Sequence, residues 1–388
     1  MPSMTRSSPV RPSDRPDRAW RRPVARRRGA ARVLVVVAAL LVSGCGLRLE
    51  TPAPTVPVAG PVERARAAAV ADARAVRSLA VAARTGTDAG VAAVLARTAD
   101  DAASHSTALG GVYVSGLVGP TPAATPTAPT TPSLPAQHDT RAVVDLLVSA
   151  AERSRAAAVS VPDGTLARLL ASISVSRLQD ARALVAAAGL PAGGTTEALT
   201  AATDLPSGAS LPGAEVTQIV LIEDQAGFAE EVAAAWLDAT AMATVLARAE
   251  VHRDRAQAWA VQASIDGTPR DPRRVAYALP VDPHDASTAG ALVATVETAL
   301  ASAYLTAVAS SGPTTATATA PTTSATVAAP SGPAPAATEG AHRTQSAGSG
   351  AGGRALLITF ADEAWTWAST WGATPSALPG FATAAPVG

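Results

Sequence analysis

Three polar residues on otherwise apolar stripes of the sequence are the first candidates for chemistry. Glu223, His252 and Glu297 each have apolar neighbours three or four positions away, so we expect them on the inward faces of three successive helices. Buried carboxylates are costly unless they are paired or bind a metal. One such side chain from each of three helices predicts either a network of ion pairs or a metal site.

The ligand count disfavours a dinuclear metal site. A di-iron bundle takes a Glu from each of two helices and a Glu-x-x-His pair from each of the other two. The residue three before His252 is Ala249, and the last helix offers Asp362 and Glu363 without a histidine. The metal alternative is therefore a depleted iron or manganese site, made of Glu223, His252, Glu297 and Glu363.

We therefore expect an ion-pair network and no bound cofactor. His252 would pair with Glu223 or Glu297, and Arg253 or Arg255 would pair with the remaining acids. The sequence has no lysine, no HExxH and no GxSxG, and its only cysteine is accounted for below. It therefore predicts no catalytic residue and no enzyme activity.

Cys45 is the second candidate for chemistry, here as a site of lipidation. An arginine-rich segment precedes an apolar run of ten residues, 33–42, which is shorter than the roughly 20 residues that a membrane-spanning helix needs. The run ends in Ser43, Gly44 and Cys45, which resembles a bacterial lipobox. We expect Cys45 to carry acyl chains such as palmitate and to anchor the protein on the extracytoplasmic face of the cell membrane.

The net charge of zero holds only for the whole chain. Residues 1–44 hold ten arginines against Asp14 and Asp17, a net charge of +8, whereas the remainder holds 21 arginines against 29 acids, a net charge of −8. An acidic mature protein is not attracted to nucleic acid or to anionic lipid. We expect no nucleic-acid partner, and a membrane contact that depends on the lipid at Cys45.

The elements that must position these residues are helices. Alanine is abundant, aromatic residues make up 3%, and apolar residues recur at spacings of three and four. The predicted fold is all-α, with two antiparallel four-helix bundles. The first set of helices is expected at about 62–84, 88–109, 140–159 and 163–188, and the second at about 214–237, 239–263, 286–309 and 354–371.

The composition also predicts the division into domains. Stretches rich in Pro, Thr, Ala and Gly lack the large apolar residues that offset the entropy of ordering, so we expect them to be linkers or disordered insertions. The predicted parts are a signal peptide at 1–44, a tether at 45–61, a first bundle at 62–190 with a disordered loop at about 114–137, a linker at 191–213, a second bundle at 214–374 with a disordered insertion at about 310–353, and a tail at 375–388.

Several short motifs resemble one family in their order and spacing. The chain resembles the actinobacterial ferritin-like lipoproteins, which are built around a domain of unknown function, and the match is best over about 214–381. The motifs are Cys45-Gly-Leu-Arg-Leu-Glu50, Leu169-Leu-Ala-Ser-Ile173, Glu223, His252-Arg253 with Asp254 and Arg255, Tyr277-Ala-Leu-Pro280, Trp371-Gly-Ala-Thr-Pro375 and Pro379-Gly380-Phe381.

This resemblance implies a ferritin-like four-helix fold for the second bundle and brings no established activity. The family tends to carry Glu-His and tyrosines in the first helix of this domain. Here the helix has Glu223-Asp224, Phe228 and Glu230 instead, which disfavours a shared metal chemistry.

Three hypotheses on function follow from these observations. The first is a lipid-anchored, non-enzymatic, envelope-associated interaction module with an unknown protein or envelope partner and no stoichiometric metal. The second is a ferritin-like metal-binding or redox protein that would lose its iron or manganese on His252→Ala. The third is a binder of small molecules near Trp259, Trp365 and Trp367.

Overall fold

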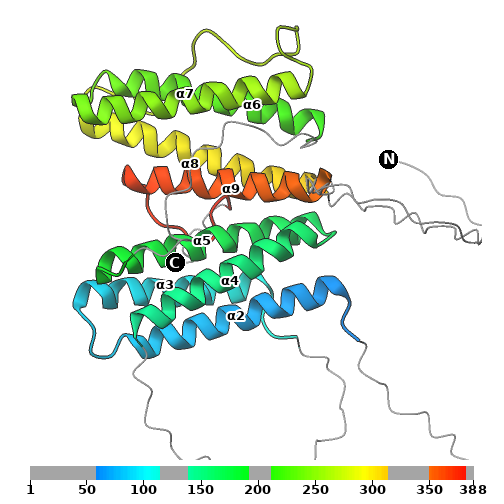
Figure 1. Cartoon of the computed structure of the whole chain (residues 1–388), viewed down its shortest axis with the longest axis vertical. Coiled ribbons are helices and arrows are strands. Elements are labelled where there is room, and N and C mark those ends of the chain that lie inside the picture. Colours follow the sequence, from blue (N-terminus) through cyan, green and yellow to red (C-terminus); the bar gives the residue numbers. More distant parts are fainter. Residues whose placement is uncertain (1–57, 114–138, 192–210, 313–348, 382–388) are drawn as a thin grey trace, which may run out of the picture. The chain divides into compact units, whose positions relative to one another are not determined.

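The computed structural model describes residues 58–113, 139–191, 211–312 and 349–381 (Figure 1). The predicted all-α class is confirmed there: eight helices form antiparallel pairs, and these ranges contain no strand. The helices are α2 (Pro61–Ala83), α3 (Ala89–Ala108), α4 (Thr140–Ser160), α5 (Gly164–Ala188), α6 (Gly213–Ala234), α7 (Ala239–Gln262), α8 (Ala286–Ser310) and α9 (Ser349–Thr370).

Several expectations fall outside the described residues. These are the signal peptide, Cys45 and nearly all of its tether, the loop at 114–137, and most of the linker at 191–213 and of the insertion at 310–353.

Two helix ends differ from the sequence-based expectation. α9 begins at Ser349 instead of about Arg354. The Arg354 side chain donates hydrogen bonds to the carbonyls of Ser311, Ala158 and Val161. These contacts hold the helical turn around Arg354 in place, and adding residues to an existing turn costs less free energy than forming a first turn. α6 ends at Ala234 instead of about Leu237, because the backbone hydrogen bonds of the next three residues join residues three apart instead of four apart.

Five of the eight helices in the described ranges begin behind an aspartate. Each of these side chains accepts a hydrogen bond from a backbone N–H of the first turn, which would otherwise lack a partner. At α8 the cap is reciprocal, because Thr288 also bonds back to the cap residue. The capping residues are Asp88, Asp139, Asp163, Asp238 and Asp285.

Short connections set the pairing of the helices. Four residues or fewer separate α4 from α5 and α6 from α7, so each helix folds back along the one before it. α8 also pairs with α9, although residues 313–348 lie between them in the sequence. α8 packs on α5 and α6, and α9 packs on α4 and α5, which brings the second set of helices against the first (Figure 1).

The main apolar core crosses from one set of helices to the other. It includes Leu170 and Ile173 of α5, Leu300 of α8 and Phe360 of α9, all fully buried. Smaller clusters fill the space within α2–α5 and within α6–α8. All described residues lie in one compact unit.

The residues that follow α9 reinforce this junction. The Nε2 atom of His105 in α3 lies 2.7 Å from the carbonyl oxygen of Ala377, and the Ser172 hydroxyl in α5 donates to the carbonyl of Pro379 at 2.7 Å. A Cβ at Gly380 would lie 3.1 Å from the side chain of Leu305 in α8, so the segment approaches that helix closely. The predicted tail is packed as far as Phe381.

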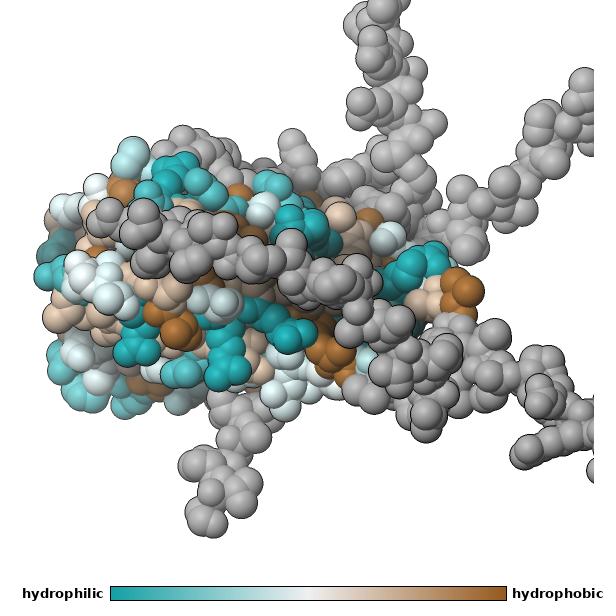
Figure 2. All heavy atoms as spheres, turned by 90° about the horizontal axis from the view of Figure 1, so that it is seen from below, coloured by the Kyte–Doolittle hydropathy of each residue, from teal (hydrophilic) through white to brown (hydrophobic). Residues whose placement is uncertain are grey.

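α8 is long and apolar enough to cross a bilayer by length and composition. Its apolar residues Leu292, Val293 and Leu300 are buried against other helices, however, and it also buries Glu297. These are the properties of the core helix of a folded domain. On the face shown in Figure 2, hydrophobic residues are scattered among hydrophilic ones.

Candidate functional site

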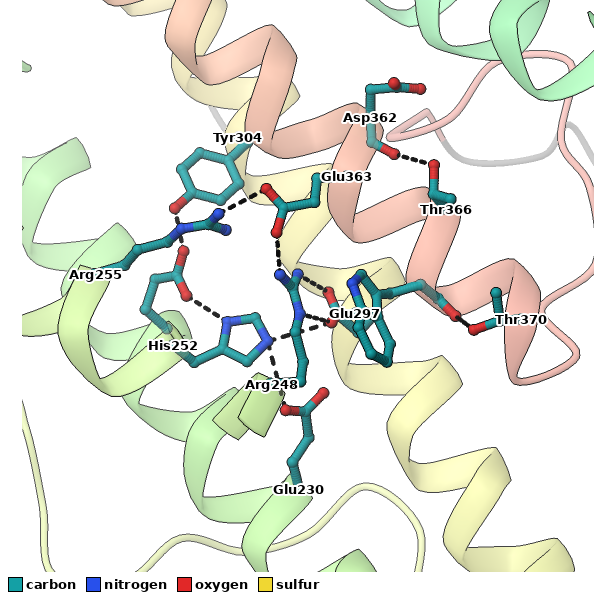
Figure 3. A network of polar contacts seen from close by, with 12 residues as sticks. Glu230, Arg248, His252, Arg255, Glu297, Tyr304, Asp362, Glu363, Thr366 and Thr370 are labelled. Carbon is teal, nitrogen blue, oxygen red and sulfur yellow. Dashed lines mark hydrogen bonds and ion pairs between the residues drawn. The ribbon is translucent and has the colours of Figure 1, made fainter. Parts of the chain in front are cut away.

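A group of polar side chains lies inside α6–α9 (Figure 3). Each helix contributes from its inward stripe, where residues four or seven apart in sequence face the same way. All are buried. The members of this polar centre are Glu223 and Glu230 from α6, Arg248, His252 and Arg255 from α7, Glu297 and Tyr304 from α8, and Glu363 from α9.

His252 is held between carboxylates on both sides of its ring. Its Nδ1 atom lies 2.6 Å from Oε2 of Glu223, and its Nε2 atom lies 3.2 Å from Oε1 of Glu297. The Tyr304 hydroxyl donates to the other oxygen of Glu223. The imidazole is therefore fixed in orientation, with Nε2 directed at Glu297 and, at 3.6 Å, at Glu230.

Two arginines occupy the rest of the polar centre. Arg248 donates from Nε and Nη2 to Glu297 at 2.5 and 3.0 Å and from Nη1 to Glu363. Arg255 donates to the second oxygen of Glu363 at 2.6 Å and stacks on Phe360, 4.0 Å from the ring centroid. The guanidinium of Arg248 thus bridges α8 and α9.

Glu230 differs from the other acids. Its side chain is fully buried, yet within the described part of the chain neither carboxylate oxygen accepts a hydrogen bond. The contact with His252 at 3.6 Å is too long to be one. A buried carboxylate without a hydrogen bond is costly.

Burial and neighbouring charges shift the pKa values of these groups in opposite directions. Burial raises the pKa of Glu230 to about 7, although His252 opposes the shift. Burial would also raise the pKa of Glu297, but Arg248 and His252 outweigh it and hold that pKa at about 2. Burial and Arg248 act to lower the pKa of His252, but the surrounding carboxylates raise it well above its ordinary value.

A second ion-pair group lies beside the polar centre, toward solvent. Arg253 donates to Asp224 at 2.6 Å and to Glu231 at 2.8 Å, and the Tyr277 hydroxyl donates to the other oxygen of Asp224 at 2.5 Å. These contacts tie the segment before α8 to α6. A largely apolar cavity of about 400 Å³ lies next to it, lined by residues that include Ile222, Ala229, Tyr277, Leu279 and Val296.

The structure brings most of the sequence-based candidates together. His252 pairs with both Glu223 and Glu297, and Arg255 pairs with Glu363, whereas Arg253 pairs outside the polar centre.

Sequence reasoning did not assign Arg248 or Glu230 to this group. Arg248 lies four residues before His252, and Glu230 lies seven after Glu223, so both share an inward stripe with a recognised member. The spacing along each helix could therefore have identified both residues as inward-facing.

A dinuclear metal centre does not fit these residues. The carboxylates of Glu297 and Glu363, which such a centre would use, are bridged by the guanidinium of Arg248. A smaller set does fit one cation, because single ligand atoms of Glu230, His252 and Glu297 all lie within 4.8 Å of one another.

None of the three cavities described for the residues in the structure is lined by Trp259, Trp365 and Trp367 together. Trp259 and Trp365 are buried in the main apolar core, and Trp367 contacts Arg248. Trp365 also lines a cavity of about 290 Å³ with Arg97 and Arg182, but neither Trp259 nor Trp367 borders it.

Comparison of the chain with protein-family models, with curated proteins and with solved structures finds no match.

Proposed function

We propose that this protein is a lipid-anchored, extracytoplasmic helical protein that acts as a non-enzymatic, envelope-associated interaction module. The observation that carries the anchoring is the position of Cys45, the only cysteine, directly after a short apolar run and two small residues. A diacylglyceryl thioether with further acylation gives stable attachment, whereas a single acyl chain gives only marginal binding.

The finer architecture is part of the same proposal. α2–α5 form one antiparallel four-helix bundle, and α6–α9 form a second of the ferritin-like kind, related to the actinobacterial ferritin-like lipoproteins. The support is that α6 packs on α7 and α8, α8 packs on α9, and all four helices contribute to one polar centre.

The absence of enzyme activity is proposed from the content of that centre. In ferritin-like oxidases the equivalent interior holds two metal ions between carboxylates and histidines. Here Arg248 and Arg255 supply the positive charge next to Glu297 and Glu363. Fixed guanidinium groups compensate carboxylates without offering a redox centre.

The anchoring is tested with Cys45→Ala. We expect the wild-type protein in the membrane fraction after an alkaline wash, with acyl chains on Cys45 by mass spectrometry. The variant should carry no acyl chain, and the protein from which residues 1–44 have been cleaved should leave the membrane fraction, because the acidic remainder without its lipid has no attraction to anionic lipid.

Thr51→Ala, a few residues along the expected tether, is the matched control and should stay membrane-bound. Retention of cleaved Cys45→Ala protein in the washed membranes would show that something other than the lipid holds it there.

A further inference from the structure

Glu230 is a buried acid whose place in the fold is not explained by hydrogen bonding. The other three carboxylates of the polar centre each accept hydrogen bonds from an arginine, a histidine or a tyrosine. Glu230 accepts none within the described residues, although its side chain is fully buried and points toward His252 (Figure 3). Such a group requires a partner, and the nearest cationic contact is the Nε2 atom of His252 at 3.6 Å.

The distances around Nε2 resemble those between the ligands of one metal ion. Metal–nitrogen and metal–oxygen bonds of about 2.0–2.2 Å place neighbouring ligand atoms about 3–3.5 Å apart. The Nε2 atom of His252 lies 3.2 Å from Oε1 of Glu297 and 3.6 Å from Oε2 of Glu230. All three ligand atoms lie within 4.8 Å of one another, so a cation among them would draw the carboxylates of Glu230 and Glu297 closer together.

The surroundings also suit a metal-binding histidine. Such a histidine usually donates its other ring N–H to a carboxylate, which fixes the ring. Nδ1 of His252 lies 2.6 Å from Glu223, and Glu223 is in turn held by the Tyr304 hydroxyl. Oε1 of Glu297 also accepts from Arg248, but a carboxylate oxygen has two lone pairs and can face both groups.

The charge count of the polar centre is compatible with a bound divalent cation. The polar centre contains four carboxylates and two guanidinium groups, and its carboxylates favour a proton on His252 in the metal-free protein. A metal-binding histidine must lose that proton, which leaves two excess negative charges when all four carboxylates are ionised. One divalent cation supplies the missing charge. It would lie next to Glu230, the one carboxylate that lacks a hydrogen bond.

We propose that Glu230, His252 and Glu297 bind one divalent transition-metal cation inside α6–α9, with Glu223 as the positioning residue for the imidazole. One imidazole and two carboxylates are suitable ligands for Mn²⁺, Fe²⁺, Co²⁺ and Zn²⁺. The cation joins α6, α7 and α8 and has a structural role. This inference departs from the sequence-based expectation of no stoichiometric metal, and it does not depend on the membrane anchor.

The test is cation binding by the full chain, with Cys45→Ala in every sample so that no thiol can bind metal. The probes are Mn²⁺, Co²⁺ and Zn²⁺, measured by elemental analysis after gel filtration and by thermal unfolding. We expect one cation per chain and a rise in Tm of about 5 to 10 °C at 100 times the Kd. Bound Co²⁺ should also show visible absorption that reports its ligands.

Glu230→Gln is the decisive variant. It keeps the shape of the side chain and removes a ligand that makes no hydrogen bond in the metal-free protein, so the metal-free Tm should not fall. Cation affinity should fall more than 100-fold. Glu223→Gln should lower the affinity about 10- to 100-fold, as the loss of a positioning partner does. Glu250→Gln, an exposed acid of α7, is the matched control and should change neither quantity.

Three results would overturn the proposal. One is failure of all three cations to bind, which would mean that protons alone balance Glu230. Another is unchanged affinity in Glu230→Gln, which would place the cation elsewhere. The third is unfolding of metal-free Glu230→Gln, which would make Glu230 a structural contact. None of these results bears on membrane attachment, which the Cys45→Ala fractionation tests separately.

Discussion

Asp180 of α5 and Asp101 of α3 are two acids that share one arginine. Arg97 lies 3.3 Å from Asp180 and 4.0 Å from Asp101, and Asp180 is almost completely buried. Burial raises the pKa of Asp180 to about 7, and the neighbouring Asp101 adds to the shift, while Arg97 and Thr98 oppose it. Ionised Asp180 is therefore a source of instability near neutral pH.

The sign of the pH dependence follows from that shift. A pKa of about 7 in the folded state, against an ordinary value of 3.8, means that the folded state binds the proton more tightly. The contribution of Asp180 to the free energy of unfolding is full below about pH 4 and is lost as the pH rises through 7. Asp180→Asn should therefore stabilise the protein at pH 8 by about 1–4 kcal/mol and change little at pH 4.

Urea unfolding at the two pH values measures this difference. Asp145→Asn, an exposed acid of α4, is the control and should show no such pH dependence. Equal destabilisation of Asp180→Asn at both values would instead mean that the ion pair with Arg97 dominates.

At the scale of helices, the first turn of α5 touches the last turn of α8. A Cβ on Gly164 would lie 2.1 Å from the carbonyl oxygen of Ala309. Because the obstacle is backbone, it cannot rotate away, and one helix end would have to shift. This contact joins the two sets of helices and requires a glycine for space rather than for a special backbone angle.

Gly164→Ala should lower the free energy of unfolding by about 1–3 kcal/mol, the usual cost of overpacking. Gly213→Ala is the matched control, since Gly213 is also the first residue of a helix but has nothing within 4 Å of the added methyl group. It should stay within about 0.5 kcal/mol of wild type. Urea titration followed by circular dichroism compares the two. An unchanged Gly164→Ala protein would mean that α5 and α8 are further apart in solution.

At the scale of the molecule, the described helices share one main core. Residues of α2, α4 and α5 lie in the same apolar cluster as residues of α6–α9. The segment after α9 also binds α3 and α5 through backbone carbonyls. Separating the two sets of helices would expose this surface, so neither set should unfold alone.

We therefore expect one cooperative unfolding transition. The tryptophans of the described residues all lie in the second set, at positions that include Trp259 and Trp365, whereas circular dichroism at 222 nm reports all eight helices. The two signals should give the same urea midpoint in a protein without residues 1–44, which hold Trp20. A lower midpoint by circular dichroism than by fluorescence would mean that α2–α5 unfold first as a separate domain.

The sequence by itself determined which segments are helical and which of their residues face inward. Apolar spacings of three and four and aspartates before first turns are local signals, because they act within one or two helical turns. The same periodicity placed Glu223, His252 and Glu297 on inward stripes. The two misplaced helix ends depended on contacts outside the helix or on tightening of the final turn.

Only the tertiary structure decided the partners of those inward residues. Any of four carboxylates could have contacted His252, because the apolar pattern of one helix does not specify how far that helix is shifted along its axis relative to its neighbours. The packing of α6 on α7 and α8 placed Glu223 at one ring nitrogen and Glu297 and Glu230 at the other, and it directed Arg248 to Glu297 and Glu363. Charge compensation in a buried centre depends on distances of a few ångströms between helices, and those distances exist only once the core has packed.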